Sequence, residues 1–306
     1  MITEALFRRH VHAHGGDREV VLLDVAQEYI LEHMRREGLF DGVVVFKGGT
    51  ALRKFVFGSE GRFSTDLDFA LVSDDPAEAE AVLNALDGAG ILGVRIDLER
   101  RETVWARLRI DTALGPVTEP AAISIRTQPP WLPVVWRKPM PFEYLDQGLR
   151  REFTRSPLPL PDIRELAAEK IAAFWRRRHA RDLYDLEHLG RVLQPRFDGT
   201  TIAALAALKI FFDVVDEGLG CPPSGVEDVF ACAANEVVGA SDLGRFRAAV
   251  TDVRPLLARC AQRYSVLPKL EEELHRIVTT CGRRDRFRAL ALRDSLISHL
   301  ASSPRG

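Results

Sequence analysis

The chain has 306 residues, of which 46% are hydrophobic and 28% charged, a composition typical of a globular protein with one large domain or two ordinary ones. Its net charge of -2 argues against a uniformly basic nucleic-acid binder. No apolar run approaches the roughly 18–20 residues that cross a bilayer. Residues 1–10 lack the basic-then-apolar order of a secretion signal, so we expect a cytoplasmic protein without a membrane partner.

Cysteine and histidine usage gives little sign of a metal centre. The four cysteines form no Cys-x-x-Cys pair, so we expect reduced thiols rather than a zinc site or disulfides; they are Cys221, Cys232, Cys260 and Cys281. His10, His12 and His14 alternate and could bind a metal, but we expect a solvated N-terminal segment.

Helix and strand patterns alternate through the first half of the chain. Asp17 to Arg36 carries a helical apolar stripe, with Asp17 as a plausible N-cap and Gly38 as a plausible stop. Residues 73–76 cap another helix, which has proline near its first turn and ends near Leu86. The remaining expected elements are a strand at 42–46, a helix at 51–57, and strands within 62–71, 94–98, 103–111 and 121–126.

Prolines separate this half from the next. The stretch from Pro129 to Pro141 predicts a loop or an excursion at the edge of a domain, and the prolines of 156–161 mark a boundary. Beyond Pro161 the pattern is almost entirely helical. We therefore predict an α/β half over residues 1–155 and an all-α half over residues 156–306.

The sequence Ser64-Thr65-Asp66-Leu67-Asp68 carries the clearest chemical signal. Side chains of a strand alternate between faces, so Asp66 and Asp68 are expected on one side. Two adjacent carboxylates suit Mg²⁺, which neutralises charge on a transferring phosphate. An isolated Asp-x-Asp is also common on solvated strands, so this motif needs support from its surroundings.

Upstream, Lys47-Gly48-Gly49-Thr50 joins a strand to a helix. Glycines let backbone N–H groups approach a phosphate, and a helix N-terminus favours an anion. A Gly-Gly turn alone is weak, but one that lies about 17 residues before an Asp-x-Asp motif is more specific.

Downstream, Asp162 to Glu165 has a capping-box pattern and opens an amphipathic helix. Lys170 lies on its apolar stripe, so its ammonium group must either reach solvent or meet a triphosphate or a carboxylate. Asp185 follows fifteen residues later. The region from Arg150 to Asp182 holds nine Lys/Arg against five Asp/Glu, which indicates either a solvated helix face or a basic patch.

Taken together, four segments resemble the AbiEii/MenT-type nucleotidyltransferase toxins of bacterial toxin–antitoxin systems. They are residues 46–52, residues 62–69, Ala168-Glu169-Lys170-Ile171 and residues 181–186. They occur in that family's order and cover roughly Val43 to Leu189.

The resemblance implies a polymerase-β-like core, with a mixed sheet flanked by helices, and a helical C-terminal half that contributes Lys170 and Asp185 to the site. It implies Mg²⁺-dependent transfer of a nucleoside monophosphate from an NTP, often to the tRNA 3′ end, which blocks translation, and control by a cognate antitoxin. Asp66 and Asp68 would hold the metal, and Asp185 would complete the essential acids. The nucleotide-binding set would be Lys47, Gly48, Gly49, Ser64, Arg107 and Lys170, with Ser64 also a regulatory position. Candidate RNA-backbone contacts are Arg150, Arg151, Arg155 and Arg176–Arg178.

One departure concerns the third acid that relatives often carry on a later strand. The corresponding run here is Ile123-Ser124-Ile125-Arg126, without a carboxylate. Asp111 could substitute if the strand register differs, although Asp185 is the better candidate. Catalysis with one well-held metal is then an alternative to a two-metal mechanism.

Two other functions remain open from the sequence. One keeps the nucleotide site and transfers to a protein hydroxyl. The other is a nucleotide-binding regulator without transfer, which the absence of an acid at Ser124 makes credible.

Overall fold

The computed structural model describes residues 3–15, 17–177, 179–193, 199–215 and 286–302. These residues form two compact units, each considered by itself. The first contains the described residues up to 130 and residues 134–161; the second contains residues 131–133 and the described residues from 162 onward. The four cysteines lie outside the described residues.

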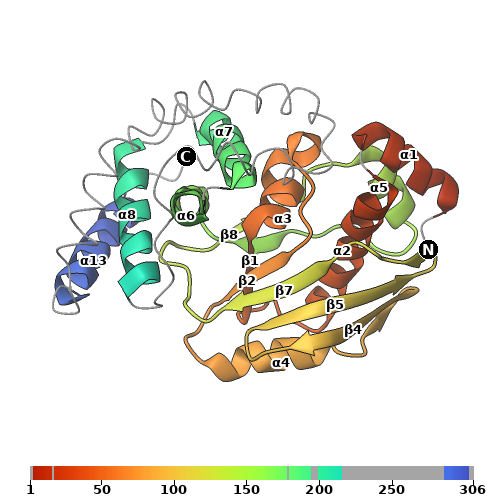
Figure 1. Ribbon diagram of the computed structural model, residues 1–306, viewed down its shortest axis with the longest axis horizontal. Helices are drawn as coiled ribbons and strands as arrows, with labels where there is room; N and C mark the ends of the chain where they lie inside the picture. Colours follow the sequence, from red (N-terminus) through yellow and green to blue (C-terminus); the bar gives the residue numbers. More distant parts are fainter. Residues whose placement is uncertain (1–2, 16, 178, 194–198, 216–285, 303–306) are drawn as a thin grey trace. The chain divides into compact units, whose positions relative to one another are not determined.

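A seven-stranded mixed sheet forms the centre of the first unit (Figure 1). Its strand order is β1-β2-β7-β5-β4-β3, and β6 pairs with β5. Within this sheet β2 and β7 run parallel, and the other pairs are antiparallel. The strands are β1 (Val44–Lys47), β2 (Leu67–Leu71), β3 (Gly90–Ile91), β4 (Val94–Arg101), β5 (Trp105–Thr112), β6 (Gly115–Pro116) and β7 (Ala121–Arg126).

Helices of the first unit pack their apolar residues with one face of this sheet into a single core. They are α1 (Glu4–His14), α2 (Arg18–Arg36), α3 (Gly48–Leu52), the π-helix η1 (Arg53–Phe57), α4 (Pro76–Leu86) and α5 (Glu143–Leu149); the 3-10 turn η2 (Gly58–Glu60) follows η1. The predicted caps are confirmed: Asp17 accepts a hydrogen bond from the Glu19 amide, and Asp75 accepts one from the Ala77 amide. The helix expected over 51–57 widens to a π-helix after Leu52.

Alternate residues of the central strands explain why one face is buried and the other is polar. On β5, Ala106, Leu108 and Ile110 face the core, whereas Arg107 and Arg109 between them are exposed. β7 alternates in the same way. The strands expected at 94–98, 103–111 and 121–126 are therefore confirmed, with small shifts at their ends.

Two predictions about irregular segments are wrong. The proline-rich stretch contains a strand, β8 (Val135–Arg137), which pairs with β9 (Leu158–Leu160). Its prolines do not prevent this, because an edge strand tolerates residues that lack an N–H group. β9 lies beyond residue 155, where the sequence suggested a boundary, and it packs within the first unit. The expected solvated N-terminal segment is instead the helix α1.

Every regular element that the structure describes after Pro161 is a helix. These are α6 (Ile163–Arg177), α7 (Ala180–Leu193), α8 (Gly199–Val215) and α13 (Arg286–Ser302). Within this unit α6 packs against α7 and α8. An all-α second half stays a prediction, because residues 216–285 lie outside the description. In the described part of the chain, no helix is both long and apolar enough to cross a membrane.

Candidate active site

The glycine turn lies directly against the second aspartate of the Asp-x-Asp motif. Lys47, the last residue of β1, pairs with Asp68 on β2, so the turn that follows is held beside that carboxylate. Gly48 has a φ of 78°, which other residues rarely adopt. A Cβ built on Gly48 would overlap the Asp68 carboxylate. The local backbone and the close approach therefore both require glycine here.

Gly49 makes the same kind of approach to the segment before the motif. A Cβ built there would lie 2.8 Å from Ser64 Oγ and 2.7 Å from Arg62 Nη2. Ser64 therefore lies beside the turn, as the resemblance implied. Sequence reasoning missed Arg62, a buried cation at the same place.

The geometry of Ser64 and Asp66 differs from the strand prediction. β2 begins at Leu67, so strand alternation accounts for Asp68 but not for the two earlier residues. Side chains of α2 and α3 hold this backbone instead. The Gln27 side-chain amide donates to the Ser64 carbonyl at 2.9 Å, and the Thr50 hydroxyl donates to the Asp66 carbonyl at 2.5 Å. Side chains from two helices thus position the acidic motif.

Ser124 occupies the position next to Asp68 on β7. The two residues are paired across the parallel strands, and the Ser124 hydroxyl donates to Asp68 Oδ1 at 2.6 Å. Trp105 of β5 pairs with Ser124, which places Asp111 six residues farther along β5. At about 3.4 Å per residue that is about 20 Å, so Asp111 does not substitute for the third acid.

A buried ionic cluster joins α2 to the residues that follow α3, and sequence analysis missed it. Arg53 and Lys54 follow α3 and both reach Asp24 of α2, with N–O distances of 3.1 Å. Lys54 also meets Glu28 at 2.9 Å, and Arg155 meets Glu28 at 2.8 Å. The sequence feature that could have revealed this cluster is the pair Asp24 and Glu28, two acids four residues apart on the apolar stripe of α2.

Charge in this cluster is compensated despite burial. Burial alone would raise the pKa of Asp24, but Arg53 and Lys54 outweigh it and hold the pKa well below its usual value. Burial likewise opposes ionisation of Glu28, and Arg155 and Lys54 lower its pKa. Arg155 is therefore a buried structural cation, with a side chain only 5% exposed, and its expected role as an RNA contact is wrong.

The N-terminal histidines belong to the same interior. His10 is fully buried, with Nε2 3.6 Å from Asp24 Oδ2, and its ring contacts that of His14. Burial first, and the neighbouring His10 second, lower the pKa of His14 to about 4. Of the three histidines, His12 alone faces solvent. Helix periodicity, with i and i+4 on one face, explains the pattern better than the expected solvated segment.

In the second unit, Lys170 is paired rather than snorkelling. Its Nζ lies 2.8 Å from Asp185 Oδ2 and 3.2 Å from Asp182 Oδ1, and all three side chains are buried. The carboxylate partner that the sequence left open is thus present. Asp182 was not predicted as part of this group, although it lies one helical turn before Asp185.

Comparison with known proteins identifies the family. The model of the nucleotidyl transferase AbiEii toxins, type IV toxin–antitoxin systems, matches residues 29–266, which is more than half of the chain. The chain belongs to this family. Its structure resembles that of MenT4, a nucleotidyltransferase toxin of Mycobacterium tuberculosis H37Rv, at 31% sequence identity and a TM-score of 0.78, over 97% of this chain and 99% of that one.

JHP933 from Helicobacter pylori is also similar, at 20% identity and a TM-score of 0.44, over 81% of this chain and 96% of that one. No curated protein sequence matches the chain. The mixed sheet flanked by helices is the nucleotidyltransferase-like fold that membership in the AbiEii family implies.

The surroundings of Asp68 leave room for a metal ligand on one side of its carboxylate. Asp68 offers one oxygen to Ser124, and the other lies beside Gly48, where the missing Cβ leaves space. Mg²⁺ usually takes one or two carboxylates and completes its ligands with phosphates and water. In the part of the chain that the structure describes, no three His, Cys, Asp or Glu side chains form a full metal-binding group. If a magnesium ion binds here, Asp66 and Asp68 would be its two carboxylate donors.

The remaining basic candidates differ in exposure. Arg150 and Arg151 are exposed, and Arg176 forms an ion pair with Asp213 at 3.2 Å. Arg178 lies outside the described residues. The predicted basic patch is thus partly neutralised by pairing.

The predicted capping box of α6 forms only in part. Asp162 caps the helix by accepting from the Arg164 amide at 2.9 Å. Glu165 does not reach back to Asp162; its carboxylate accepts from the amides of Trp131 and Leu132 and from Lys209. Glu165 therefore organises the second unit's interior instead of the helix end.

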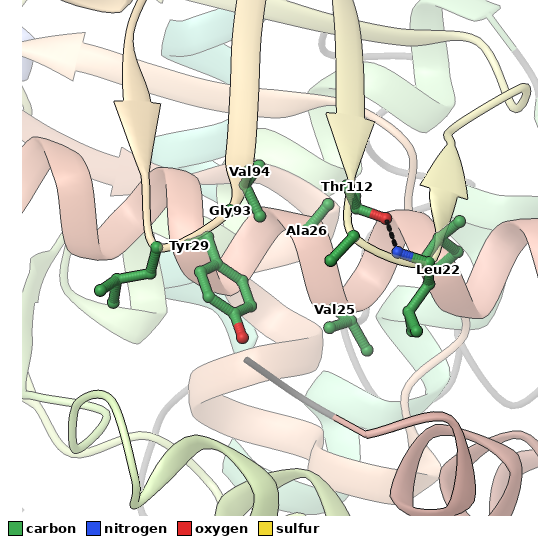
Figure 2. A pocket seen from close by; sticks show the side chains of 10 residues that line it. Leu22, Val25, Ala26, Tyr29, Gly93, Val94 and Thr112 are labelled. Carbon is green, nitrogen blue, oxygen red and sulfur yellow. Dashed lines mark hydrogen bonds between the residues drawn. The ribbon is translucent and has the colours of Figure 1, made fainter.

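A separate recess in the first unit is apolar and carries no reactive group. Figure 2 shows it between α2 and the ends of β4 and β5, lined among others by Leu22, Tyr29 and Val94. The one hydrogen bond drawn there joins the Leu114 amide to the Thr112 hydroxyl at 3.1 Å. The acids and glycines of the toxin site are not among its lining residues.

Proposed function

We propose that this AbiEii-family toxin transfers a nucleoside monophosphate from an NTP to the 3′ end of an RNA, with tRNA as the acceptor, and so blocks translation in the cytoplasm. The observation that carries the proposal is the contact of the Gly48–Gly49 turn with Asp68 and Ser64. It joins a backbone that can approach phosphates to carboxylates that can hold a metal.

The first unit's residues divide the work of binding. Backbone N–H groups of Gly48 and Gly49, with the Lys47 cation before them, would bind the triphosphate, and Ser64 would lie beside it. Asp66 and Asp68 would hold Mg²⁺, which when bound neutralises charge on the reacting phosphate. The hydrogen bond from Ser124 keeps Asp68 in one orientation.

We further propose that Lys170 and Asp185 of the helical unit serve the reaction, as the family resemblance implies. Asp182 and Asp185 hold the Lys170 ammonium group in a defined position, which suits a cation that binds phosphate oxygens. Asp185 would then be the remaining essential acid, since Ser124 cannot serve as one.

In the reaction, the acceptor hydroxyl attacks the α-phosphorus in line. The new oxygen–phosphorus bond forms as the bond to the β-phosphate breaks, the hydroxyl proton passes to solvent water, and pyrophosphate leaves. The protein contributes positioning and charge stabilisation rather than a covalent intermediate.

Ser124 favours one competing function, a nucleotide-binding regulator without transfer, because it replaces an acid that relatives often carry. Transfer to a protein hydroxyl is the other. Incubation with each labelled NTP and total RNA separates the three. Label in tRNA supports the proposal, whereas label in protein, or nucleotide binding without any label transferred, contradicts it.

Control of the toxin is proposed at two levels. Type IV toxin–antitoxin membership implies a cognate antitoxin. Phosphorylation of Ser64 would add about -1.5 to -2 charges beside Asp66 and the glycine turn, and would compete with the triphosphate. Ser64→Ala should stay active and Ser64→Glu should not. Mass spectrometry that finds Ser64 unmodified while co-expressed antitoxin suppresses activity would exclude this route.

A further inference from the structure

Four side chains, each partly exposed, form a row across one face of the first unit's sheet. Register pairs Lys47 with Asp68, Asp68 with Ser124, and Ser124 with Trp105. Residues paired across neighbouring strands lie on one face. Ala106, the next residue after Trp105, is fully buried on the opposite face. Trp105 therefore shares the face of the proposed metal carboxylate.

The direction of in-line transfer gives this row two ends with different roles. Pyrophosphate leaves on the side where the triphosphate is bound, which is the β1 side with its Gly48–Gly49 turn. The attacking hydroxyl must come from the opposite side of the α-phosphorus. From Asp68 that side leads over β7 to β5, where Trp105 lies two strand spacings away, or about 10 Å.

The chemistry on this side suits a single-stranded nucleic acid. The Trp105 ring is partly exposed, and the Arg100 guanidinium lies 5.8 Å from its centre. Unpaired bases stack on such aromatic rings, and arginine adds a cation–π contribution. A folded protein surface offers a hydroxyl but no flat base to cover the ring.

Arg107 supplies the charge that a phosphate needs. It is exposed on the same face as Trp105, two residues farther along β5. Its neighbours are already paired: Arg109 with Asp97 at 2.8 Å, and Arg100 with Glu102 at 3.3 Å. Arg107 itself makes no ion pair with any residue that the structure describes.

We propose that this face, named here the acceptor face and made of Ser124, Trp105 and Arg107, binds the single-stranded 3′ end of the acceptor RNA. Trp105 stacks on a terminal base and Arg107 contacts a backbone phosphate. The inference rests on the proposed transfer to RNA and specifies where its acceptor binds. It also moves Arg107 from the nucleotide-binding set to the acceptor.

The first test compares Trp105→Ala with a matched control, Trp136→Ala, whose tryptophan on β8 is 57% exposed and not on the acceptor face. Trp105→Ala should raise the KM for tRNA about 5- to 100-fold and leave equilibrium binding of the NTP unchanged. Trp136→Ala should change neither. A Trp105→Ala variant that loses NTP affinity instead would assign the ring to the incoming nucleotide and overturn the inference.

The second test uses salt. Arg107→Ala should lower the slope of log RNA affinity against log salt by about 0.7, the value for one phosphate contact on a single strand. Arg101→Ala is the control, because Arg101 contacts Asn84 of α4, on the other side of the sheet. An unchanged slope, or a raised KM for NTP alone, contradicts the role of Arg107.

The outcomes separate this inference from the proposed function. If the wild-type protein labels no RNA, the proposed function fails and the acceptor face fails with it. If the wild type labels tRNA and both Trp105→Ala and Arg107→Ala keep its RNA kinetics, the acceptor face alone is wrong. Transfer to protein that is impaired by Trp105→Ala would overturn RNA as the occupant.

Discussion

The Ser124 hydroxyl donates a hydrogen bond of 2.6 Å to Asp68 Oδ1 on the neighbouring parallel strand. A carboxylate at this position would face Asp68 directly and repel it unless a cation lay between them. The serine instead satisfies one oxygen of the Asp68 side chain with a hydrogen bond. In this chain, one oxygen of the Asp68 carboxylate therefore binds a neutral group, the Ser124 hydroxyl.

Ser124→Asp should convert that stabilisation into a dependence on Mg²⁺. Two paired carboxylates repel each other, so the Tm of the variant in EDTA should fall below that of the wild type and recover when Mg²⁺ is added. Ser124→Ala is the control: it should cost about 1.5–3 kcal/mol through the lost hydrogen bond, with little response to Mg²⁺. A Ser124→Asp protein with the same Tm in EDTA and in Mg²⁺ would contradict this account.

Gly48→Ala should abolish transfer for a reason that goes beyond backbone strain. The added Cβ would overlap the Asp68 carboxylate at a φ of 78°. Gly88→Ala is a matched control, because Gly88 has a φ of 71° and nothing within 4 Å of the place that its added methyl group would take. Both should lose about 1–2 kcal/mol of stability from the left-handed backbone. Gly48→Ala should lose more because of the overlap, and only Gly48→Ala should lose transfer. Equal activity in the two variants would show that the close approach is not needed.

Local patterns were enough to predict much of the fold and part of the site. The helix from Arg18 to Arg36, its Asp17 cap and the central strands follow from periodicity and capping residues that are close in sequence. The Gly48–Asp68 relationship was suggested by spacing, and the register of β1 and β2 explains it. These features need no knowledge of distant contacts.

Long-range partners could not be predicted in this way. The interaction between Arg155 and Glu28 joins residues 127 positions apart, and periodicity carries no information about such pairs. Lys170 shows the same limit. The apolar stripe around it would suit an uncharged side chain, but its two carboxylate partners lie on the next helix. We expected His10 and His14 to be solvated because histidines alternate at positions 10, 12 and 14. In the helix, His10 and His14 lie on one buried face.

Lys170→Met should destabilise the protein, although methionine suits the apolar stripe. The change would leave the buried carboxylates of Asp182 and Asp185 without their cation, which typically costs about 3–5 kcal/mol. Arg191→Met on the same helix pair is the control, because Arg191 is 55% exposed and its ion pair with Glu187 should contribute at most about 1 kcal/mol. Urea unfolding of both variants measures the difference; equal losses would refute a structural pairing at Lys170.

His14 should make stability depend on pH in a defined window. Its pKa in the folded protein is about 4, against an ordinary 6.5. Between these values the unfolded chain binds a proton that the folded protein does not, so stability falls as pH is lowered from about 6.5 to about 4. The loss of Asp24 ionisation lies at lower pH, because its pKa is held well below the usual value.

His14→Gln should flatten the Tm profile in this window, whereas His12→Gln, which changes an exposed residue of the same helix, should leave it unchanged. Thermal unfolding at half-unit steps between about pH 4 and about pH 7.5 provides the profile. If His14→Gln and wild type lose stability in parallel as the pH is lowered, His14 is not the responsible group.

Asp66 and Asp68 are proposed to hold the metal for nucleotidyl transfer to RNA. The most direct measurement compares transfer of labelled NMP to purified tRNA by the wild type, Asp66→Asn and Asp68→Asn, with Tm measured in parallel. Each variant should lose at least about a hundredfold in rate, the loss expected when several kcal/mol of charge stabilisation are removed. Both should keep their Tm, since the amide oxygen in Asp68→Asn can still accept the Ser124 hydrogen bond. A folded Asp66→Asn or Asp68→Asn protein that labels tRNA at the wild-type rate would contradict the mechanism.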